Sequence, residues 1–106
     1  MKQVCPPTYG QVDTLLEVLS KSKSMHILLV LDRKRRPIRF SELKKLVESS
    51  STTISRRLKE LETHGLVQRS QSRVSKSTYE YSLSEDAESL KPILQSLYDW
   101  ANERSY

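Results

Sequence analysis

The chain lacks several features that define common classes of protein. Its 106 residues include one cysteine and two glycines, and no run reaches the roughly 18 apolar residues that a membrane-spanning helix needs. A single cysteine cannot form a disulfide within the chain, and the N-terminus has no hydrophobic signal segment. Scarce glycine argues against a long flexible linker. We therefore expect one domain, residues 1–106, in the cytoplasm and not on a membrane.

Patterns typical of enzymes and metal proteins are also missing. The chain has no glycine-rich phosphate loop, no supported Ser-His-Asp set and no paired carboxylates in a predicted cleft,. Its two histidines, His26 and His64, have no Cys, Asp or Glu at metal-ligand spacing,. We expect no catalytic residues, no metal and no cofactor.

Positive charge, in contrast, is abundant and concentrated in the middle of the chain. Residues 33–76 carry thirteen basic and four acidic side chains, a net charge of +9, whereas residues 1–32 are neutral and residues 77–106 carry −4. A cationic block binds a polyanion because each neutralised phosphate releases counterions. The charge distribution therefore favours a nucleic acid as partner, and with it a location at the nucleoid.

The most informative stretch lies between residues 50 and 67. Ile54, Leu58 and Leu61 have the spacing i, i+4, i+7, which predicts the buried stripe of an amphipathic helix,. Ser50 is a suitable N-cap, and His64-Gly65 is a suitable C-terminal end. The opposite face is polar and cationic, and helices of this kind can enter the major groove. Its DNA-binding candidates are Ser51, Thr52, Ser55, Arg56 and Lys59.

An ordinary surface helix with a solvated basic face has the same pattern, so the neighbouring segments decide between the two interpretations. Residues 41–47 predict a preceding helix capped by Ser41, and residues 48–50 a short turn, which makes 41–64 a helix-turn-helix,. Residues 66–83 predict a β-hairpin in which Tyr79, Tyr81 and Leu83 face inward. Its polar loop, residues 71–77, resembles a wing. Candidate contacts to the DNA backbone are Lys44, Lys45, Arg73 and Lys76.

The sequence leaves two alternatives for the role of Arg57 and two for the role of the cationic run 33–36. Arg57 lies near the buried edge of its helix, where it can reach a phosphate or a carboxylate. The run 33–36 is either a solvated turn or part of the DNA-binding surface.

The ends of the chain are predicted to be apolar helices. Residues 1–8 should form an extended arm, because the residue before each proline disfavours the helical region, and Thr8 should cap a helix over 9–20. A buried helix is expected over 25–31, then a charged turn over 32–37. The last helix, 84–104, should be kinked at Pro92. One small domain has limited area in which to bury two broad apolar stripes, which favours a dimer that covers them. The alternative is that both helices close the core of the monomer. The candidates for a dimer interface are Val12, Leu16, Leu19, Leu90, Leu94, Leu97 and Trp100.

The order of these motifs resembles the HxlR-type family of bacterial and archaeal transcription regulators, relatives of the MarR-type winged-helix proteins. The likeness covers most of the chain. It is carried by Cys5-Pro6, Ile27-Leu28-Leu29 with Leu31, the stretch 39–43, the run 55–67 followed by Arg69, the stretch 79–84, and 90–94 with Leu97 and Trp100. The chain departs from the family at residues 22–24, Ser-Lys-Ser, where Gly-Lys-Trp is usual.

This resemblance implies an α+β, mainly α, winged helix-turn-helix with N- and C-terminal dimerisation helices. It further implies a homodimer on a roughly palindromic operator, and hence a sequence-specific transcription regulator that binds double-stranded DNA. Cys5 matches the position of a cysteine that reports oxidants or electrophiles in some relatives, and the alternative is a spectator thiol on the arm. A nucleoid-type architectural DNA-binding protein and a winged-helix protein-interaction module remain as alternative functions.

Overall fold

The computed structural model describes the backbone of residues 7–105 and the side chains of residues 9–105. This part of the chain forms five helices and one three-stranded sheet. In order they are α1 (Pro7–Leu19), α2 (Ser24–Lys34), β1 (Ile38–Arg39), α3 (Phe40–Val47), α4 (Ser51–Thr63), β2 (Val67–Gln71), β3 (Tyr79–Leu83) and α5 (Glu85–Glu103).

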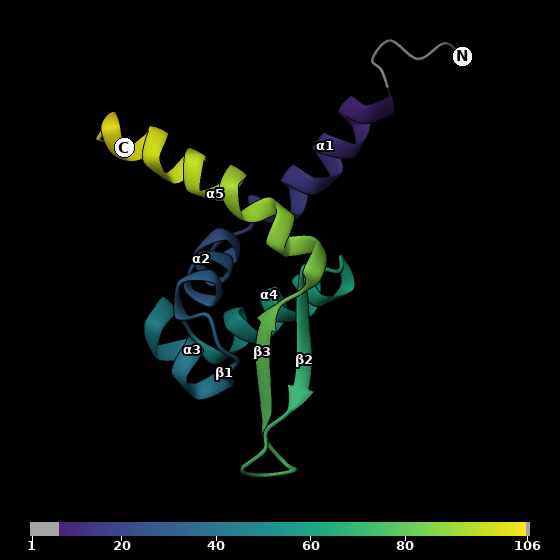
Figure 1. Cartoon of the computed structure of the whole chain (residues 1–106), viewed down its shortest axis with the longest axis vertical. Helices are drawn as coiled ribbons and strands as arrows, with labels where there is room; N and C mark the ends of the chain where they lie inside the picture. The colour runs from purple at the N-terminus through teal and green to yellow at the C-terminus, as the bar shows by residue number, and fades with distance from the viewer. Residues whose placement is uncertain (1–6, 106) are drawn as a thin grey trace.

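The elements form a body with two helices that leave it at one end (Figure 1). Helices α2, α3 and α4 and the sheet make the body, the β2–β3 loop extends from its lower end, and α1 and α5 diverge from its upper end as the arms of a V. The sheet is antiparallel with the strand order β1-β3-β2, so that Ile38 pairs with Tyr81 and Val67 with Leu83. This is the mainly helical winged helix-turn-helix that the sequence predicts.

Helix α2 lies at the centre of the hydrophobic core. Its Ile27 and Leu28 are fully buried, and it contacts α1, α3, α4, α5 and β3. The other buried members of the core from the body come from β1, α3, α4, β2 and the turn between α4 and β2. They include Ile38, Leu43, Val47, Ile54, Leu58, Leu61, Leu66 and Val67. None of the described helices combines the length and the apolar character needed to cross a membrane.

Helix α1 begins earlier than expected. Its first residue is Pro7, so the prediction of an extended arm over residues 1–8 is wrong for its last two residues, and Thr8 lies inside the helix instead of capping it. Proline is suited to the first helical position because the amide hydrogen that it lacks would have no partner there. The rest of the predicted arm lies outside the described residues.

Helix α2 extends further than expected, and α3 begins differently. Residues 32–34, predicted as part of a turn, form the last turn of α2, where Arg33 and Lys34 meet the negative end of the helix dipole,. Arg35, in the cap position directly after the helix, has a φ of 53°. Helix α3 begins at Phe40 with Arg39 in the cap position and without a side-chain capping bond, so the prediction that Ser41 caps this helix is wrong.

The ends of α4 and the start of α5 follow their sequence signals. The Ser50 hydroxyl accepts a hydrogen bond from the Thr53 amide at 3.2 Å, and Gly65 has a φ of 75° at the C-terminal end of α4. Similarly, the Ser84 hydroxyl accepts from the Ala87 amide at 3.1 Å. Helix α5 continues through Pro92 as one helix.

Strand β3 does not bury all three predicted residues. Tyr81 and Leu83 pack against the core, but Tyr79 is 41% exposed. It pairs with Gln71 at the end of the hairpin that lies away from the core. The Arg69 guanidinium covers its ring there, 4.5 Å from the centroid.

Candidate nucleic-acid interface

Helix α4 is held to the body by its apolar stripe. Ile54 and Leu61 are fully buried and Leu58 is 2% exposed. A helix anchored along one stripe must present the opposite side to solvent. The polar and cationic side of α4 is therefore a fixed surface of the body.

The predicted DNA-binding residues of α4 lie together on that surface. All five are exposed, and they line one open groove together with Phe40 at the start of α3. The first turn of α4 contains no acidic side chain. The residues that share the groove are Ser51, Thr52, Ser55, Arg56 and Lys59.

Phe40 is a member of the groove that sequence reasoning missed. Its side chain is partly buried and packs against the core, while its remaining surface borders the groove. The apolar residue directly before the predicted helix over 41–47 was the available signal. However, only the packing of α3 against α4 places it beside the recognition residues.

Arg57 is occupied within the protein. Its Nε donates to the Ser22 carbonyl at 2.9 Å, and one terminal nitrogen lies 2.9 Å from a carboxylate oxygen of Glu60. The side chain is only 13% exposed. Of the two roles that the sequence left open, the structure supports the carboxylate, and Arg57 ties α4 to the segment that joins α1 to α2.

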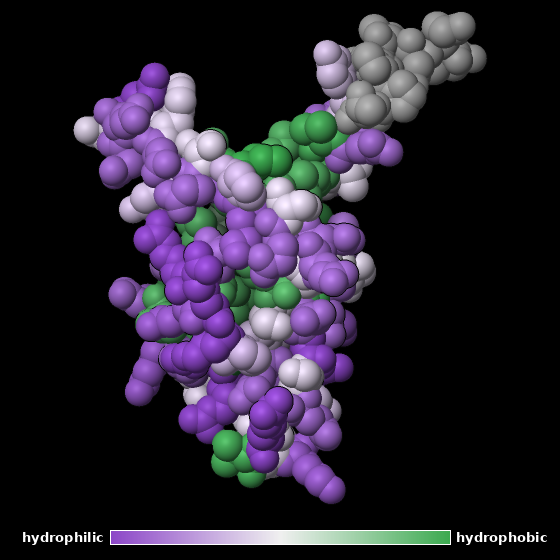
Figure 2. Space-filling view, viewed as in Figure 1, coloured by the Kyte–Doolittle hydropathy of each residue, from purple (hydrophilic) through white to green (hydrophobic). Residues whose placement is uncertain are grey.

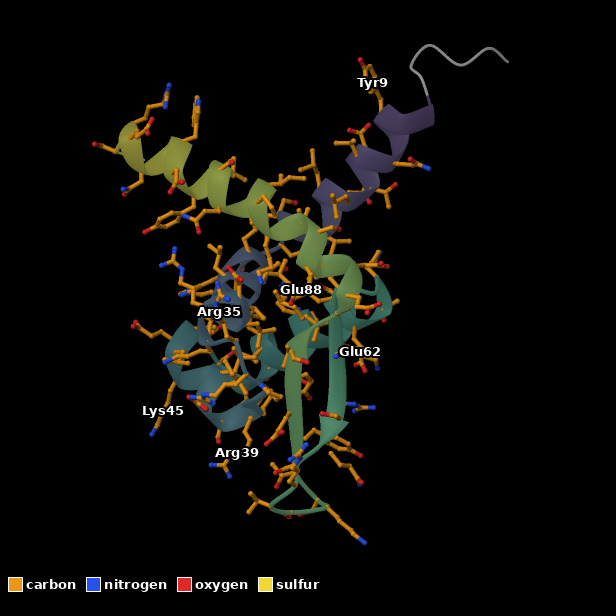
Figure 3. The ribbon with its side chains drawn as sticks, viewed as in Figure 1. Tyr9, Arg35, Arg39, Lys45, Glu62 and Glu88 are labelled. Atoms are coloured by element: carbon orange, nitrogen blue, oxygen red, sulfur yellow. The ribbon has the colours of Figure 1, made fainter. Side chains whose placement is uncertain are left out.

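The cations of α3 and β1 lie on the segment that precedes the groove-bearing helix in the chain. Lys44 and Lys45 are exposed in the last turn of α3. Lys45 shares a shallow hollow with Arg39 and Ser41, and Figure 3 shows Arg39 and Lys45 projecting from the lower, wing-bearing half of the body. Arg39 is exposed and was not among the sequence candidates.

The run 33–36 is partly used in contacts within the chain. The two terminal nitrogens of Arg36 donate to the two carboxylate oxygens of Glu42, at 3.2 and 2.7 Å. This hydrogen bonding holds the pKa of Glu42 below its ordinary value and raises that of Arg36. The Arg33 guanidinium lies over the Tyr98 ring. Lys34 and Arg35 are exposed.

The wing is a braced loop with cations on its outside. Ser72 is buried; its amide donates to the Thr78 carbonyl at 2.8 Å, and its hydroxyl accepts from the Val74 amide. The Gln71 side chain donates to the Lys76 carbonyl at 3.0 Å. These bonds hold the loop closed. The side chains that it leaves exposed include both predicted wing contacts, Arg73 and Lys76.

The opposite end of the molecule exposes apolar side chains. Figure 2 shows hydrophobic surface over α1 and in the V between α1 and α5, whereas most of the lower half is hydrophilic. Four of the predicted interface residues are about half exposed, and Tyr9 and Ile93 on the same two helices are exposed as well. The four are Val12, Leu16, Leu97 and Trp100.

The remaining predicted interface residues belong to the core of the single chain. Leu19 and Leu94 are 8% and 3% exposed, and Leu90 packs against the same core. These three side chains pack against the body of the single chain, because α1 and α5 each turn a second apolar face toward it, and their part in a dimer stays a prediction. The available surface is thus the outer stripe of each helix.

Two further sequence expectations concern Cys5 and metal binding. Cys5 lies outside the described residues, so its role as a redox sensor stays a prediction. Among residues 7–105, no three His, Cys, Asp or Glu side chains are grouped so that they could hold a metal ion.

Comparison with known proteins places this arrangement in a family. The model of the HxlR-like helix-turn-helix family matches residues 18–105. This chain belongs to that family. The match spans α2 to α5, the helix-turn-helix and the wing, so the elements that form the groove are those that the family shares.

The curated relatives that the chain matches are named as uncharacterized HTH-type transcriptional regulators. The HTH-type transcriptional regulator YvaP of Bacillus subtilis is 34% identical over 102 residues, which cover 95% of this chain and 89% of YvaP. BH0655 of Halalkalibacterium halodurans, also an HTH-type transcriptional regulator, is 40% identical over 75 residues, 70% of this chain and 66% of BH0655. The reduced form of the transcriptional regulator YodB from B. subtilis has a TM-score of 0.75 at 26% identity, covering 95% of this chain and 94% of YodB. The chain is thus a helix-turn-helix transcriptional regulator.

Proposed function

We propose that this regulator acts as a homodimer that reads a pseudo-palindromic DNA operator, as a repressor or an activator. The observation that carries the proposal is the groove on α4. Five exposed polar and cationic side chains line it, on a helix whose other face is anchored by Ile54, Leu58 and Leu61. A rigid helix with hydroxyl and guanidinium donors suits the major groove, which is about 12 Å wide.

The groove residues are assigned roles by their chemistry. Arg56 can bind guanine through two hydrogen bonds, a contact worth about 1–3 kcal/mol of discrimination. Lys59 supplies a point charge, and the hydroxyls of Ser51, Thr52 and Ser55 supply short donors and acceptors.

The other exposed cations are assigned to the DNA backbone. Contacts to phosphate position a protein without reading sequence. Arg73 and Lys76 extend from the wing, and Lys44, Lys45 and Arg39 from the segment before α4. These side chains would contribute affinity that falls as salt concentration rises.

A second copy of the chain is the proposed occupant of the apolar end. Val12 and Leu16 on α1 and Ile93, Leu97 and Trp100 on α5 form exposed stripes on two diverging helices. Burying such stripes stabilises a symmetric dimer. A dimer also sets two recognition helices about 34 Å apart, the spacing of major-groove half-sites.

The decisive experiment is a titration of the chain with fluorescent duplexes. A palindromic site selected by footprinting on genomic DNA is compared with a random duplex of equal length, each at two salt concentrations. We expect the selected site to bind at least 100-fold more tightly. Equal affinities with a steep salt dependence would support the architectural alternative, and no binding at all would support a protein-interaction module.

The dimer is tested separately by sedimentation velocity. Leu97→Asp places a charge in the outer stripe of α5 and should yield a folded monomer. Asn102→Asp adds the same charge on the exposed opposite side of α5 and should leave the dimer intact. A dimer that tolerates Leu97→Asp would place the interface elsewhere.

Control of this regulator by thiol oxidation is a further part of the proposal. YodB has been solved in both a reduced and a diamide-treated form, and Cys5 is the only cysteine of this chain. Two Cys5 thiols that lose two electrons and two protons to diamide would form a disulfide between subunits. Diamide should therefore change operator affinity in the wild type but not in Cys5→Ser, and equal responses would remove Cys5 from the mechanism.

A further inference from the structure

Helix α5 is tied to the end of α2 by a charged side chain. The Lys91 ammonium lies 3.1 Å from a carboxylate oxygen of Asp32 on α2 and 2.8 Å from one of Glu88 on α5 itself. Lys91 and Asp32 are 25% and 17% exposed. Because both groups are partly shielded from water, their attraction is screened less than that of a fully exposed pair.

A second contact joins the same two helices further along α5. The Arg33 guanidinium lies 5.2 Å from the centroid of the Tyr98 ring. Asp32 and Arg33 are consecutive in the last turn of α2, whereas Lys91 and Tyr98 are two helical turns apart on one face of α5, about 10 Å along its axis. One turn of α2 therefore holds α5 at two points.

These two points lie on either side of the place where α5 leaves the body. Ala87 and Leu94 are the buried side chains of α5, and residues 96–100 are all exposed. Pro92 lies between Lys91 and Tyr98 and interrupts the backbone hydrogen bonding of the helix,. The direction of the outer half of α5 thus depends strongly on contacts outside the core, and Figure 1 shows that half projecting past α2.

We propose that the Asp32–Lys91 and Arg33–Tyr98 contacts set the angle between α5 and the helix-turn-helix, and so determine which half-site spacing the dimer accepts. This inference rests on the proposed function. The outer half of α5 is a lever about 18 Å long. A rotation of roughly 10° moves its end by about 3 Å, comparable to the 3.4 Å rise of one base pair. Small changes at Asp32 or Tyr98 are therefore sufficient to alter the register of two recognition helices.

Because Lys91 forms ion pairs with two carboxylates, those of Asp32 and Glu88, substitutions of the two provide a matched pair of variants. Asp32→Asn and Glu88→Gln each remove one partner of Lys91 and one negative charge. Only Asp32→Asn weakens the link between α2 and α5, because Glu88 and Lys91 are on the same helix. A third variant, Tyr98→Leu, removes the second link, and Lys91→Arg retains both ion pairs.

The readout is affinity for operators whose half-sites are closer or further apart by one and two base pairs. We expect the wild type, Glu88→Gln and Lys91→Arg to share one sharp optimum. Asp32→Asn and Tyr98→Leu should reduce the preference for that optimum over its neighbours at least threefold, or shift it. Their affinity for an isolated half-site should change less than twofold.

A measurement without DNA separates this inference from the proposed function. Spin labels at Thr63→Cys in a Cys5→Ser background report the distance between the two α4 helices of a dimer. The distance distribution should broaden or shift in Asp32→Asn and stay unchanged in Glu88→Gln. Unchanged distances and spacing profiles in Asp32→Asn and Tyr98→Leu, in a wild type that binds its operator, would overturn this inference alone. A wild type that neither dimerises nor prefers an operator would overturn both.

Discussion

The two ends of the molecule present opposite kinds of surface. At the helix-turn-helix and wing, apolar side chains such as Ile54 and Leu61 are fully buried and cations cover the outside. At the α1 and α5 end, Leu16 and Leu97 remain about half exposed. Within residues 9–105, each of these two helices thus satisfies only one of its two apolar faces.

This difference indicates which partner each end suits. A cationic surface over a rigid core gains little from burial of apolar area, but it gains from neutralising phosphates. An exposed apolar stripe gains from being covered, at roughly 25 cal/mol per Å². The body is accordingly matched to DNA and the helical end to a second copy of the chain, and each assignment can be tested by changes confined to one end.

The largest effect, a loss of operator affinity, is expected from substitutions in the groove on α4. Replacing Arg56 and Lys59 by glutamine removes two positive charges and should weaken operator binding at least about 30-fold, because each lost contact costs about 1–3 kcal/mol. Fluorescence anisotropy measures this loss. Lys21→Glu makes the same net change in charge at an exposed position between α1 and α2 and should have a much smaller effect. Equal losses in the two proteins would mean that charge alone, and not the groove, directs binding.

The next effect compares equal truncations at the two ends. Leu58→Ala removes a buried anchor of α4 and should lower the free energy of unfolding by about 2–5 kcal/mol. Leu97→Ala removes an exposed side chain and should change it by less than about 0.5 kcal/mol at dilutions where the wild type is monomeric. Urea unfolding followed by circular dichroism measures both. A large loss in monomeric Leu97→Ala would show that the outer stripe of α5 supports the single chain.

A smaller effect, an increase in the free energy of unfolding, is expected from a change at the start of α2, which lies between the two ends of the molecule. The Ser24 hydroxyl is fully buried and is without a hydrogen-bond partner among the described residues. Since an unsatisfied buried polar group costs about 1–3 kcal/mol, Ser24→Ala should raise the free energy of unfolding by about 1 kcal/mol. The exposed Ser22→Ala is the control for thermal unfolding. A loss of stability in Ser24→Ala would indicate that an ordered water bonds to this hydroxyl.

The smallest effect concerns the pH dependence of the body. The Arg36 guanidinium lowers the pKa of Glu42 in the folded protein, so the pair stabilises the fold at pH values above the ordinary carboxyl pKa of about 4.3. This contribution is lost as the pH falls through the lowered pKa. Wild type should therefore lose more stability than Glu42→Gln on acidification below pH ~4.5. Arg36→Gln should remove the same difference, and identical acid profiles for wild type and Glu42→Gln would contradict the pairing.

Local signals determined much of this protein. The caps at Ser50 and Ser84 and the turn at Gly65 depend on residues within four positions, so the ends of α4 and the start of α5 could be predicted. The stripe of Ile54, Leu58 and Leu61 defined the buried side of α4 by its period, and it thereby defined the exposed groove residues as well. Periodicity is a property of the chain itself, and it needs no knowledge of the neighbours.

Only the tertiary structure decided which apolar side chains are packed in the core of the single chain and which charged side chains are paired within it. The sequence could not separate Leu94 in the core from Leu97 outside it, because α5 is apolar on two adjoining faces and the position of α2 selects one of them. Long cations reach several partners. The contacts of Arg57 with Ser22, and of Lys91 with Asp32, join residues distant in sequence, and only folding brings those residues together.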